Sequence, residues 1–312
     1  GKYPIYGASG LIKYVDFYQR EKPYIAVVKD GAGIGRVMKL PAYSSVIGTM
    51  QYIIPNEKVD INYLVYSMEY MNLAKYFSGA TIPHIYFRDY QKEPLNLPEI
   101  KVQKKIGGIL SNIEKLIAFR NQELSKFDQL VKSRFIELFG DPVSNDKFWN
   151  LAILQDVTSK IGSGATPKGG KSSYQKEGIP FIRSMNVHDG VFLSKDLAYL
   201  SDKQAKQLEN VIVKENDVLL NITGASVARS CIVPKTVIPA RVNQHVSIIR
   251  CIPKYLNPEF LNKLFLHHRY KNLLLSLGEA GGATRQAITK SQLEKLQIIL
   301  PPLTLQNEFS DF

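Results

Sequence analysis

Gly79-Ala80-Thr81, followed by Leu97-Pro98, recurs 203 residues later in the chain as Gly282-Ala283-Thr284 and Leu300-Pro301. Other residues recur at the same offset, and an upstream block recurs at an offset of 193. The pairs are Ile85/Ile288, Lys92/Lys295, Gln103/Gln306, Gly31-Ala32/Gly224-Ala225, Arg36/Arg229 and Pro41/Pro234. The second copy therefore carries about ten extra residues between the blocks, as surface loops do. Solenoid repeats are only about 20–50 residues long, so the sequence predicts two related domains instead.

The region between the two copies follows a heptad pattern over residues 99–140. Its apolar seam consists of Ile106, Leu110, Ile113, Ile117, Leu124, Phe127, Val131 and Leu138, with Arg120 and Arg134 at two intervening seam positions. The pattern predicts one helix, about 60 Å long at 1.5 Å per residue, that stops at Gly140-Asp141-Pro142. Gly107-Gly108 weakens its first turns but would permit close packing there. A lone helix would leave this seam in water, so a second helix is expected against it, and self-association through the seam is a further expectation.

Mixed α/β sequence lies on both sides of this helix. Strands are expected at 24–28, 50–54, 218–222 and 246–249, and helices at 62–76 and 258–277. The predicted organisation is a domain at 1–98, the spacer helix at 99–140, a second domain at 141–300, and the start of another long helix at 301–312. The fold class is therefore α/β (mixed), with two related globular domains separated by a coiled-coil-type helix.

Composition indicates a soluble protein with a polyanionic partner. Hydrophobic residues make up 45% and charged residues 22% of the 312 positions. No apolar run approaches the roughly 20 residues of a membrane span, and the N-terminus lacks a signal-peptide pattern. The formal net charge of +12 favours nucleic acid. Cys231 and Cys251 lie in apolar segments, which is typical of small core residues in a reducing compartment.

Two glycine-rich stretches resemble nucleotide-binding loops only superficially. Gly31-Ala32-Gly33-Ile34-Gly35 has its third glycine one position too early for a dinucleotide fingerprint, so a tight β-turn is expected. In Gly162–Ser172, Ala165 occupies the place of the first P-loop glycine, and Pro167 removes a backbone donor. A flexible basic loop that touches a DNA backbone fits this second stretch better.

The sequence contains no pattern typical of catalysis. The five histidines are scattered without metal-ligand spacing, no paired carboxylates stand out, and the Asn-Pro-Pro-Tyr motif of amino-methyltransferases is missing. Neither a catalytic centre nor a metal site is therefore expected.

Side chains suited to reading base edges do occur in clusters. In the first domain the candidate DNA-binding residues are Lys2, Tyr3, Tyr6, Ser9, Lys13, Gln51, His84 and Arg88. In the second domain they are Lys168, Lys171, Arg183, Asn186, His188, Arg241, Asn243, Gln244, His245, Arg285 and Gln286.

Three features together resemble a known family. They are the stretch Gly1-Lys2-Tyr3-Pro4-Ile5-Tyr6-Gly7-Ala8-Ser9-Gly10; Trp149 with Gly164-Ala165-Thr166-Pro167 and Ile179-Pro180-Phe181-Ile182-Arg183; and Leu97-Pro98 with Gln103 before a helix that ends Glu137-Leu138-Phe139-Gly140-Asp141-Pro142. On these residues the chain resembles the specificity (S) subunit of type I restriction–modification enzymes, over essentially its whole length.

The resemblance implies two target recognition domains in a pseudo-two-fold arrangement, each reading half of a bipartite site in double-stranded DNA. Two long antiparallel helices from the conserved regions would set the spacing and dock methyltransferase (M) subunits, which endonuclease/translocase (R) subunits join. It also implies a non-catalytic chain in the cytoplasm of a bacterium or archaeon, with no membrane contact and no cofactor of its own, because S-adenosylmethionine and ATP/Mg belong to the partner subunits. The first domain lacks a counterpart of Trp149–Pro167, and the second helix is only begun at Gln306–Phe312, so truncation at both ends is expected.

Two alternatives stay open. The chain could be the recognition portion of a fused restriction–methyltransferase, which a methyltransferase domain upstream in the intact gene would reveal. It could also be a coiled-coil scaffold with protein-binding heads, which would show no salt-sensitive DNA binding.

Overall fold

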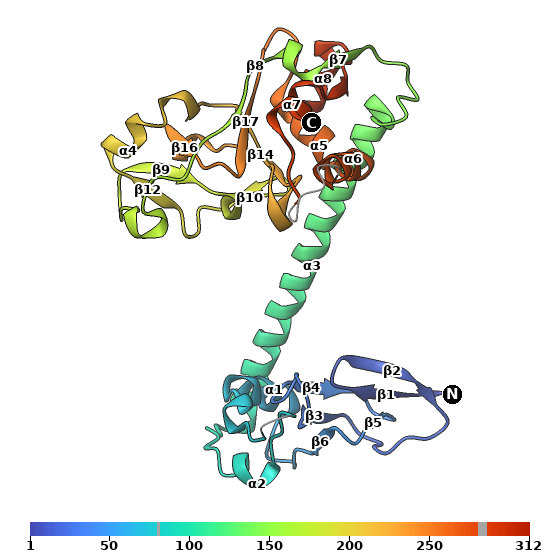
Figure 1. Ribbon diagram of the computed structural model, residues 1–312. Helices are drawn as coiled ribbons and strands as arrows, with labels where there is room; N and C mark the ends of the chain where they lie inside the picture. The colour runs from blue at the N-terminus through green and yellow to red at the C-terminus, as the bar shows by residue number, and fades with distance from the viewer. Residues whose placement is uncertain (80–81, 280–285) are drawn as a thin grey trace. The chain divides into compact units, whose positions relative to one another are not determined.

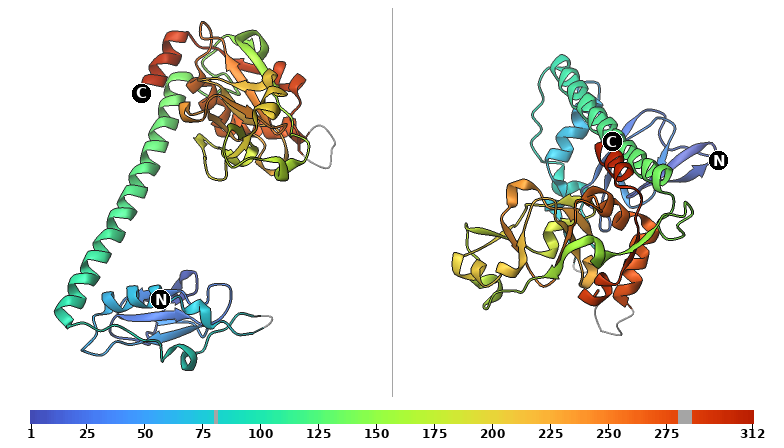
Figure 2. Two further views of the ribbon diagram at one scale, coloured as in Figure 1. Left: turned by 90° about the vertical axis from the view of Figure 1, so that its left-hand side faces the viewer. Right: turned by 90° about the horizontal axis from the view of Figure 1, so that it is seen from above.

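The computed structural model describes residues 1–79, 82–279 and 286–312 (Figures 1 and 2). The chain divides into unit 1, Gly1–Ser125, and unit 2, Lys126–Phe312. The expected mixed α/β class, with two related units and a long central helix, is confirmed. The recurring Ala80-Thr81 and Gly282-Ala283-Thr284, and the candidate Arg285, lie outside the described residues.

Unit 1 is built on the buried strand β3, which separates two small apolar clusters. Alternate side chains of β3 face opposite sides, so Ile25 and Val27 pack with helix α1, whereas Tyr24, Ala26 and Val28 pack beneath β5. The sheets have the strand orders β4-β3-β6 and β2-β1-β5. The elements are β1 (Tyr3–Gly7), β2 (Gly10–Val15), β3 (Tyr24–Val28), β4 (Val37–Leu40), β5 (Ser45–Val46), β6 (Met50–Ile53), α1 (Ile61–Tyr70), a 3₁₀ turn (Leu73–Tyr76) and α2 (Phe87–Tyr90).

Unit 2 contains two four-stranded sheets, with the orders β15-β14-β17-β8 and β12-β9-β16-β13, and the pairs β10-β11 and β18-β7. The strands are β7 (Leu151–Ile153), β8 (Thr158–Ser163), β9 (Ile179–Ile182), β10 (Val187–His188), β11 (Val191–Phe192), β12 (Ala198–Leu200), β13 (Ile212–Val213), β14 (Val218–Asn221), β15 (Ser230–Ile232), β16 (Ala240–Val242), β17 (Val246–Cys251) and β18 (Gln297–Ile299). The helices are α4 (Asp202–Lys206), α5 (Pro258–Leu266), α6 (His268–Glu279), α7 (Lys290–Glu294) and α8 (Leu303–Asp311).

The sequence repeat corresponds to a repeat of structure. Strand β3 lies between its antiparallel neighbours β4 and β6, and β14 lies in the same way between β15 and β17. The helices that follow, α1 and α5, are capped alike: the side chains of Asp60 and Asn257 each accept hydrogen bonds from the second and third backbone N–H groups beyond the cap.

A buried glutamine fixes the start of helix α3 (Ile100–Phe139) and of helix α8 by the same three hydrogen bonds. Gln103 donates to the carbonyls of Lys58 and Pro98 and accepts from the N–H of Asp60. Gln306, which is fully buried, donates to Tyr255 and Pro301 and accepts from Asn257. The recurrence of Gln103 as Gln306 therefore reflects a structural joint.

We expect Gln306→Ala to lower the free energy of unfolding of unit 2 by about 2–3 kcal/mol, because it leaves the buried Pro301 carbonyl, the part-buried Tyr255 carbonyl and the Asn257 N–H without their partner. Urea denaturation followed by fluorescence of Trp149, the only tryptophan, measures this. The exposed Gln129→Ala is the matched control and should change stability by less than about 0.5 kcal/mol. Equal losses in the two variants would contradict the joint.

Helix α3 (Ile100–Phe139) runs through 40 residues without a break, as the heptad pattern predicts (Figure 1). In unit 1 it packs closely on α1, because a Cβ on Gly107 would lie 2.8 Å from the Tyr63 nitrogen, whereas Gly108 meets open space. The close packing expected at this glycine pair therefore holds for Gly107 alone. The helix ends before Gly140, whose φ of +70° is the left-handed stop expected there.

The last turns of α3 insert into the unit 2 core through two residues outside the predicted seam. Phe135 is 3% and Phe139 0% exposed. Helix α8 lies beside these turns (Figure 2), where Phe309 contacts both rings and Arg134 donates to the Glu308 carboxylate at 2.5 Å. Of the seam residues, Val131 and Leu138 also pack against this core.

Two further expectations meet different outcomes. The helix predicted over residues 258–277 is two helices, because His267 leaves the helical conformation (ψ 129°) between α5 and α6. Cys231 and Cys251 are free and buried, as expected, and burial raises the pKa of each thiol to about 12. Among the described helices, none is long and apolar enough to cross a membrane.

Candidate DNA-recognition surfaces

Each unit gathers loops at one end of its sheets on a common hydrogen-bond framework. In unit 1 the β3–β4 loop bonds through Gly31 N–H to the Pro83 carbonyl at 2.9 Å, and Ile85 N–H bonds back to Lys29 at 2.9 Å. In unit 2 Gly224 N–H bonds to Gln286 at 2.9 Å, and Ile288 N–H to Ile222 at 2.8 Å. These residues hold matching positions in the two sequence copies, so the framework is the repeated feature.

Two more segments join each framework. The loop before β6 is held by Lys29 N–H to the Thr49 carbonyl at 3.0 Å, and the loop before β17 by Ile222 N–H to His245 at 3.0 Å. The ends of β1 and β9 are fixed by Ile47 N–H to Tyr6 and by Asn243 N–H to Ile182. We call these assemblies loop surface 1 (residues 6–10, 29–36, 47–49, 78–79 and 82–88) and loop surface 2 (residues 163–173, 182–193, 222–229, 243–245 and 286–289).

The glycines explain the shape of the β3–β4 loop. Gly31 and Gly224 have φ values of +89° and +72°, which favour glycine. A Cβ on Gly35 would lie 2.4 Å from the Ala74 nitrogen, and the matching residue in unit 2, Ala228, takes a φ of +65°. The glycine-rich stretch is thus the expected tight connection between antiparallel strands.

A histidine contacts the residue that precedes the loop glycine in both units. Nδ1 of His84 contacts the carboxylate of Asp30, and Nδ1 of His245 is hydrogen-bonded to the hydroxyl of Thr223. Asp30 and His84 line an open pocket of 640 Å³ with Thr49, Ser78 and Tyr86. The Arg88 guanidinium lies 4.5 Å from the centre of the Tyr86 ring. The pocket thus combines directional polar groups with an aromatic wall, and a cation lies over the ring that forms this wall.

Loop surface 2 extends this arrangement with amides and lysines. Thr166 donates a hydrogen bond to Gln244, whose amide nitrogen lies 3.2 Å from Nε2 of His245. Lys168 and Lys171 are exposed on the same loop as Thr166. Exposed lysines beside neutral amide and imidazole groups suit phosphate contacts beside base contacts.

The structure brings some of the predicted DNA-binding residues onto these surfaces. Loop surface 1 carries Tyr6, Ser9, His84 and Arg88; loop surface 2 carries Lys168, Lys171, Arg183, His188, Gln244, His245 and Gln286. The pKa of Tyr6 is raised, mainly by partial burial and to a smaller extent by Tyr14. The Tyr6 hydroxyl therefore keeps its proton and remains a hydrogen-bond donor. Lys2, Tyr3, Lys13 and Gln51 lie away from loop surface 1, along β1, β2 and β6 or at their far ends.

Three predicted contact residues have structural roles instead. Asn186 is fully buried and donates to the carbonyls of Leu193 and Lys195. Arg241 is 7% exposed, its Nε donates to the Ala205 carbonyl at 3.1 Å, and burial lowers its pKa. Asn243 is 5% exposed and accepts from the N–H of His245. The three side chains are therefore buried and hydrogen-bonded within unit 2, and they do not lie on the exposed part of loop surface 2.

Arg183 and His188 are committed to local contacts while remaining partly exposed. The Arg183 guanidinium donates to the Asp196 carbonyl and lies 5.6 Å from the centre of the Tyr174 ring. Nε2 of His188 lies 3.2 Å from the Met185 carbonyl oxygen.

The sequence prediction missed Asp30, Thr223, Thr49 and Tyr86. The repeat itself carries a signal for the first two, because aligning Gly31 with Gly224 places Asp30 opposite Thr223. Thr49 and Tyr86 lack such a signal, since a single threonine or tyrosine in a loop is ordinary.

The middle of the α3 seam, which crosses the boundary between unit 1 and unit 2, is exposed to solvent. Ile113, Ile117, Leu124 and Phe127 are 46–62% exposed. Ile106 and Leu110 are half-buried near α1. The neighbouring Leu116, Phe119 and Leu130 are also more than half exposed. An exposed apolar band of this kind is typical of a protein interaction surface.

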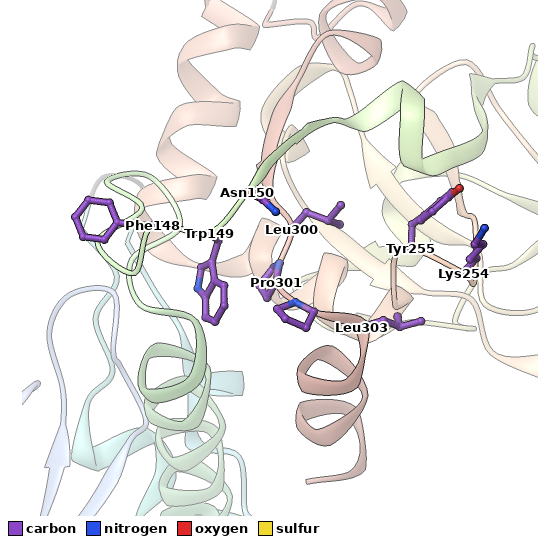
Figure 3. Close-up of a pocket in the computed structure, with 9 residues that line it drawn as sticks. Phe148, Trp149, Asn150, Lys254, Tyr255, Leu300, Pro301 and Leu303 are labelled. Atoms are coloured by element: carbon purple, nitrogen blue, oxygen red, sulfur yellow. The ribbon is translucent and has the colours of Figure 1, made fainter.

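A second pocket, which lies in unit 2, is a weaker candidate for base recognition. It measures 430 Å³ and is lined largely by apolar residues, including Trp149, Tyr255, Leu300 and Pro301 (Figure 3). Phe148 points away from the other labelled side chains. Within residues 1–79, 82–279 and 286–312, no group of three or more His, Cys, Asp or Glu residues could hold a metal ion.

Comparisons with known proteins agree with this arrangement. The family model described as "Type I restriction modification DNA specificity domain" matches residues 1–127 and 147–312. The MjaVIII type I restriction enzyme specificity subunit of Methanocaldococcus jannaschii is 22% identical and is matched over 92% of this chain and 70% of its own length. The MjaX specificity subunit of the same organism is 24% identical over 81% of this chain, which spans only 60% of that relative.

Solved structures share the fold. The S subunit of a type I restriction–modification system from M. genitalium aligns with a TM-score of 0.67 at 14% identity, covering 100% of this chain and 80% of that one. A chain from a structural study of type I R-M complex assembly aligns with a TM-score of 0.54 at 16% identity, covering 99% and 82%. Since the family model matches both copies of the repeat, the chain belongs to the type I restriction modification DNA specificity family.

Proposed function

We propose that this chain is the non-catalytic recognition subunit of a type I restriction–modification complex and that each unit reads one half of a bipartite DNA site. The observation that carries this is the repeated framework. Two units hold four loop segments by matching backbone hydrogen bonds, yet present different side chains on them. A shared backbone framework lets both units dock on DNA in the same way. The different side chains on it give each unit its own sequence preference.

Lysine and arginine contacts to phosphate supply most of the affinity in this proposal, and the loop surfaces supply sequence preference. Helix α3 serves as the spacer. Its exposed seam accepts a second antiparallel helix in this proposal. Helix α8 supports helix pairing on α3, because Phe309 and Glu308 contact Phe135 and Arg134 in the last turns of α3. Methyltransferase subunits dock on this helical region, and the endonuclease/translocase subunits join the complex through them.

S-adenosylmethionine and ATP/Mg belong to the partner subunits in this proposal. The polar groups gathered on the two loop surfaces suit DNA contacts, and the paired methyltransferase supplies the methyl transfer.

DNA binding by the full chain with its methyltransferase subunits should depend steeply on salt. If the heads contact about six phosphates, affinity for duplex DNA falls about 10³-fold between 50 and 200 mM salt. Removing the exposed charges in Lys168→Ala/Lys171→Ala should lower the slope of log K against log salt by about two, equally for all sequences. Fluorescence anisotropy with labelled duplexes measures both.

Lys126→Ala/Lys132→Ala, which removes two exposed charges from α3, is the matched control and should leave the slope unchanged. Binding that is insensitive to salt would favour a scaffold with protein-binding heads over DNA recognition.

A further inference from the structure

At three matched positions on the loop surfaces, unit 1 and unit 2 make the same backbone contacts but carry different side chains. The first precedes the loop glycine and is Asp30 or Thr223. The second precedes β6 or β17 and is Thr49 or His245. The third forms the isolated β-bridge to the first position, Asp30 to His84 in unit 1 and Thr223 to Ala287 in unit 2.

The histidine reaches the first position from a different segment in each unit. In unit 1 it comes from the third position, where His84 contacts Asp30. In unit 2 it comes from the second position, where His245 is bonded to Thr223 and the third position is Ala287. Both units thus build a polar pair at one place on the framework, from different residues.

The pair in unit 1 has the chemistry of a base-reading group. The Asp30 and His84 side chains are 25% and 26% exposed, so packing fixes them while they still face solvent. The contact engages Oδ1 of Asp30, and a carboxylate has capacity to accept further hydrogen bonds. A carboxylate repels phosphate but accepts from amino groups that cytosine and adenine present in the major groove.

The loop that carries His84 also carries a cation. Tyr86 forms a wall of the pocket, and Arg88 lies over its ring. The Tyr86 ring lies between this cation and His84, with 4.0 Å between the centres of the Tyr86 and His84 rings, and Nε of Arg88 also lies 3.7 Å from the Asp89 carboxylate. The cation and the Asp30–His84 pair can divide backbone and base contacts between them.

We propose that Asp30, oriented by His84, accepts a hydrogen bond from the amino group of a cytosine or adenine in one half-site, and that the Thr223–His245 pair reads the corresponding position in the other half-site. This rests on the proposed function and deepens it. Asp30 is the reading group, and His84 is a positioning residue.

The test uses the chain in complex with its methyltransferase subunits, with methylated sites mapped by sequencing of genomic DNA. In Asp30→Asn, the carboxylate becomes an amide of nearly the same shape. Methylation of the original site should fall about 10- to 100-fold, and selectivity should relax or change at one base pair of one half-site. The second half-site and the spacer length should be unaltered.

A second variant tests transfer of the reading pattern. Asp30→Thr/Thr49→His/His84→Ala places the three side chains of unit 2 on the framework of unit 1. Its altered position should take the base preference that unit 2 shows at the matching place. Asp16→Asn is the matched control, because this carboxylate is 94% exposed and lies beyond the far end of β2, and its motif should equal that of the wild type.

The outcomes separate the two proposals. A wild-type complex that methylates no bipartite sequence would refute the proposed function. A wild-type complex with a bipartite motif that persists in Asp30→Asn would overturn only the reading role. A folded Asp30→Asn complex that loses affinity equally on every duplex, including duplexes substituted at each half-site position, would overturn it as well.

Discussion

Replacing Phe139 by alanine should lower the free energy of unfolding of unit 2 by about 3–5 kcal/mol. The side chain is fully buried, and its ring centre lies 4.7 Å from that of Phe260, 5.0 Å from Phe135 and 5.5 Å from Phe309. Removing the ring leaves a cavity between α3, α5 and α8 and forfeits these aromatic contacts. Urea denaturation measures the loss, with Trp149 fluorescence as a local reporter, because its Nε1 donates to the Phe139 carbonyl.

Phe127→Ala is the internal control, twelve residues earlier on the same helix. Phe127 is 62% exposed, so its removal should change the free energy of unfolding by less than about 0.5 kcal/mol. The same variant should weaken association with whatever helix covers the seam. Similar destabilisation by both substitutions in the isolated chain would show that α3 is not anchored through Phe139.

Deleting Leu116–Gln122 should shift the preferred spacer of the bipartite site while leaving both half-sites intact. Seven residues shorten the helix by about 10 Å, close to three base pairs of B-DNA at about 3.4 Å each. The deletion removes a whole heptad, so Leu124 takes the seam place of Ile117, and a helix packed on the seam keeps its register. We expect methylation of sites with the original spacer to fall at least 10-fold, because both heads no longer engage one duplex.

Methylation mapping of the variant complex measures this change. Deleting four residues instead, Ile117–Arg120, interrupts the seam pattern and should reduce assembly with the methyltransferase subunits as well as methylation. A heptad deletion that retained the original spacer length would argue that α3 does not set the distance between the half-sites.

Strong local periodicity made α3 predictable almost to the residue. Forty residues of one pattern leave little room for error, and a glycine in the left-handed region marks the end. The same pattern could not identify Phe135 and Phe139 as anchors, because they lie off the seam and are buried by unit 2. The apolar spacing also gave no sign of the break at His267 between α5 and α6. A single residue that leaves the helical conformation does not alter the spacing on either side.

The candidate recognition surfaces were only partly predictable, because the sequence does not show which polar side chains are exposed. Polarity identifies residues that can bond a base, but the same groups bond a loop from within. Asn186, Arg241 and Asn243 do the latter, whereas Gln244 and His245, from the same run of sequence, remain on the surface. The sequence analysis did not select Asp30, because an acidic residue in a basic protein is not an obvious DNA contact. The orientation of its carboxylate also depends on His84, which lies 54 positions away in the chain.

The glutamine joint has a consequence for how such a protein changes over generations. Gln103 and Gln306 each bond twice to the segment before α1 or α5 and once to the proline carbonyl ahead of their own helix, and these matching bonds fix the start of α3 and α8. A crossover that exchanges the sequence upstream of either glutamine would therefore replace the globular part of one unit. The hydrogen bonds that fix the start of the following helix would be kept. If each unit reads one half-site, as proposed above, recombination can combine two existing specificities in a single event while the direction of α3 or α8 stays unchanged.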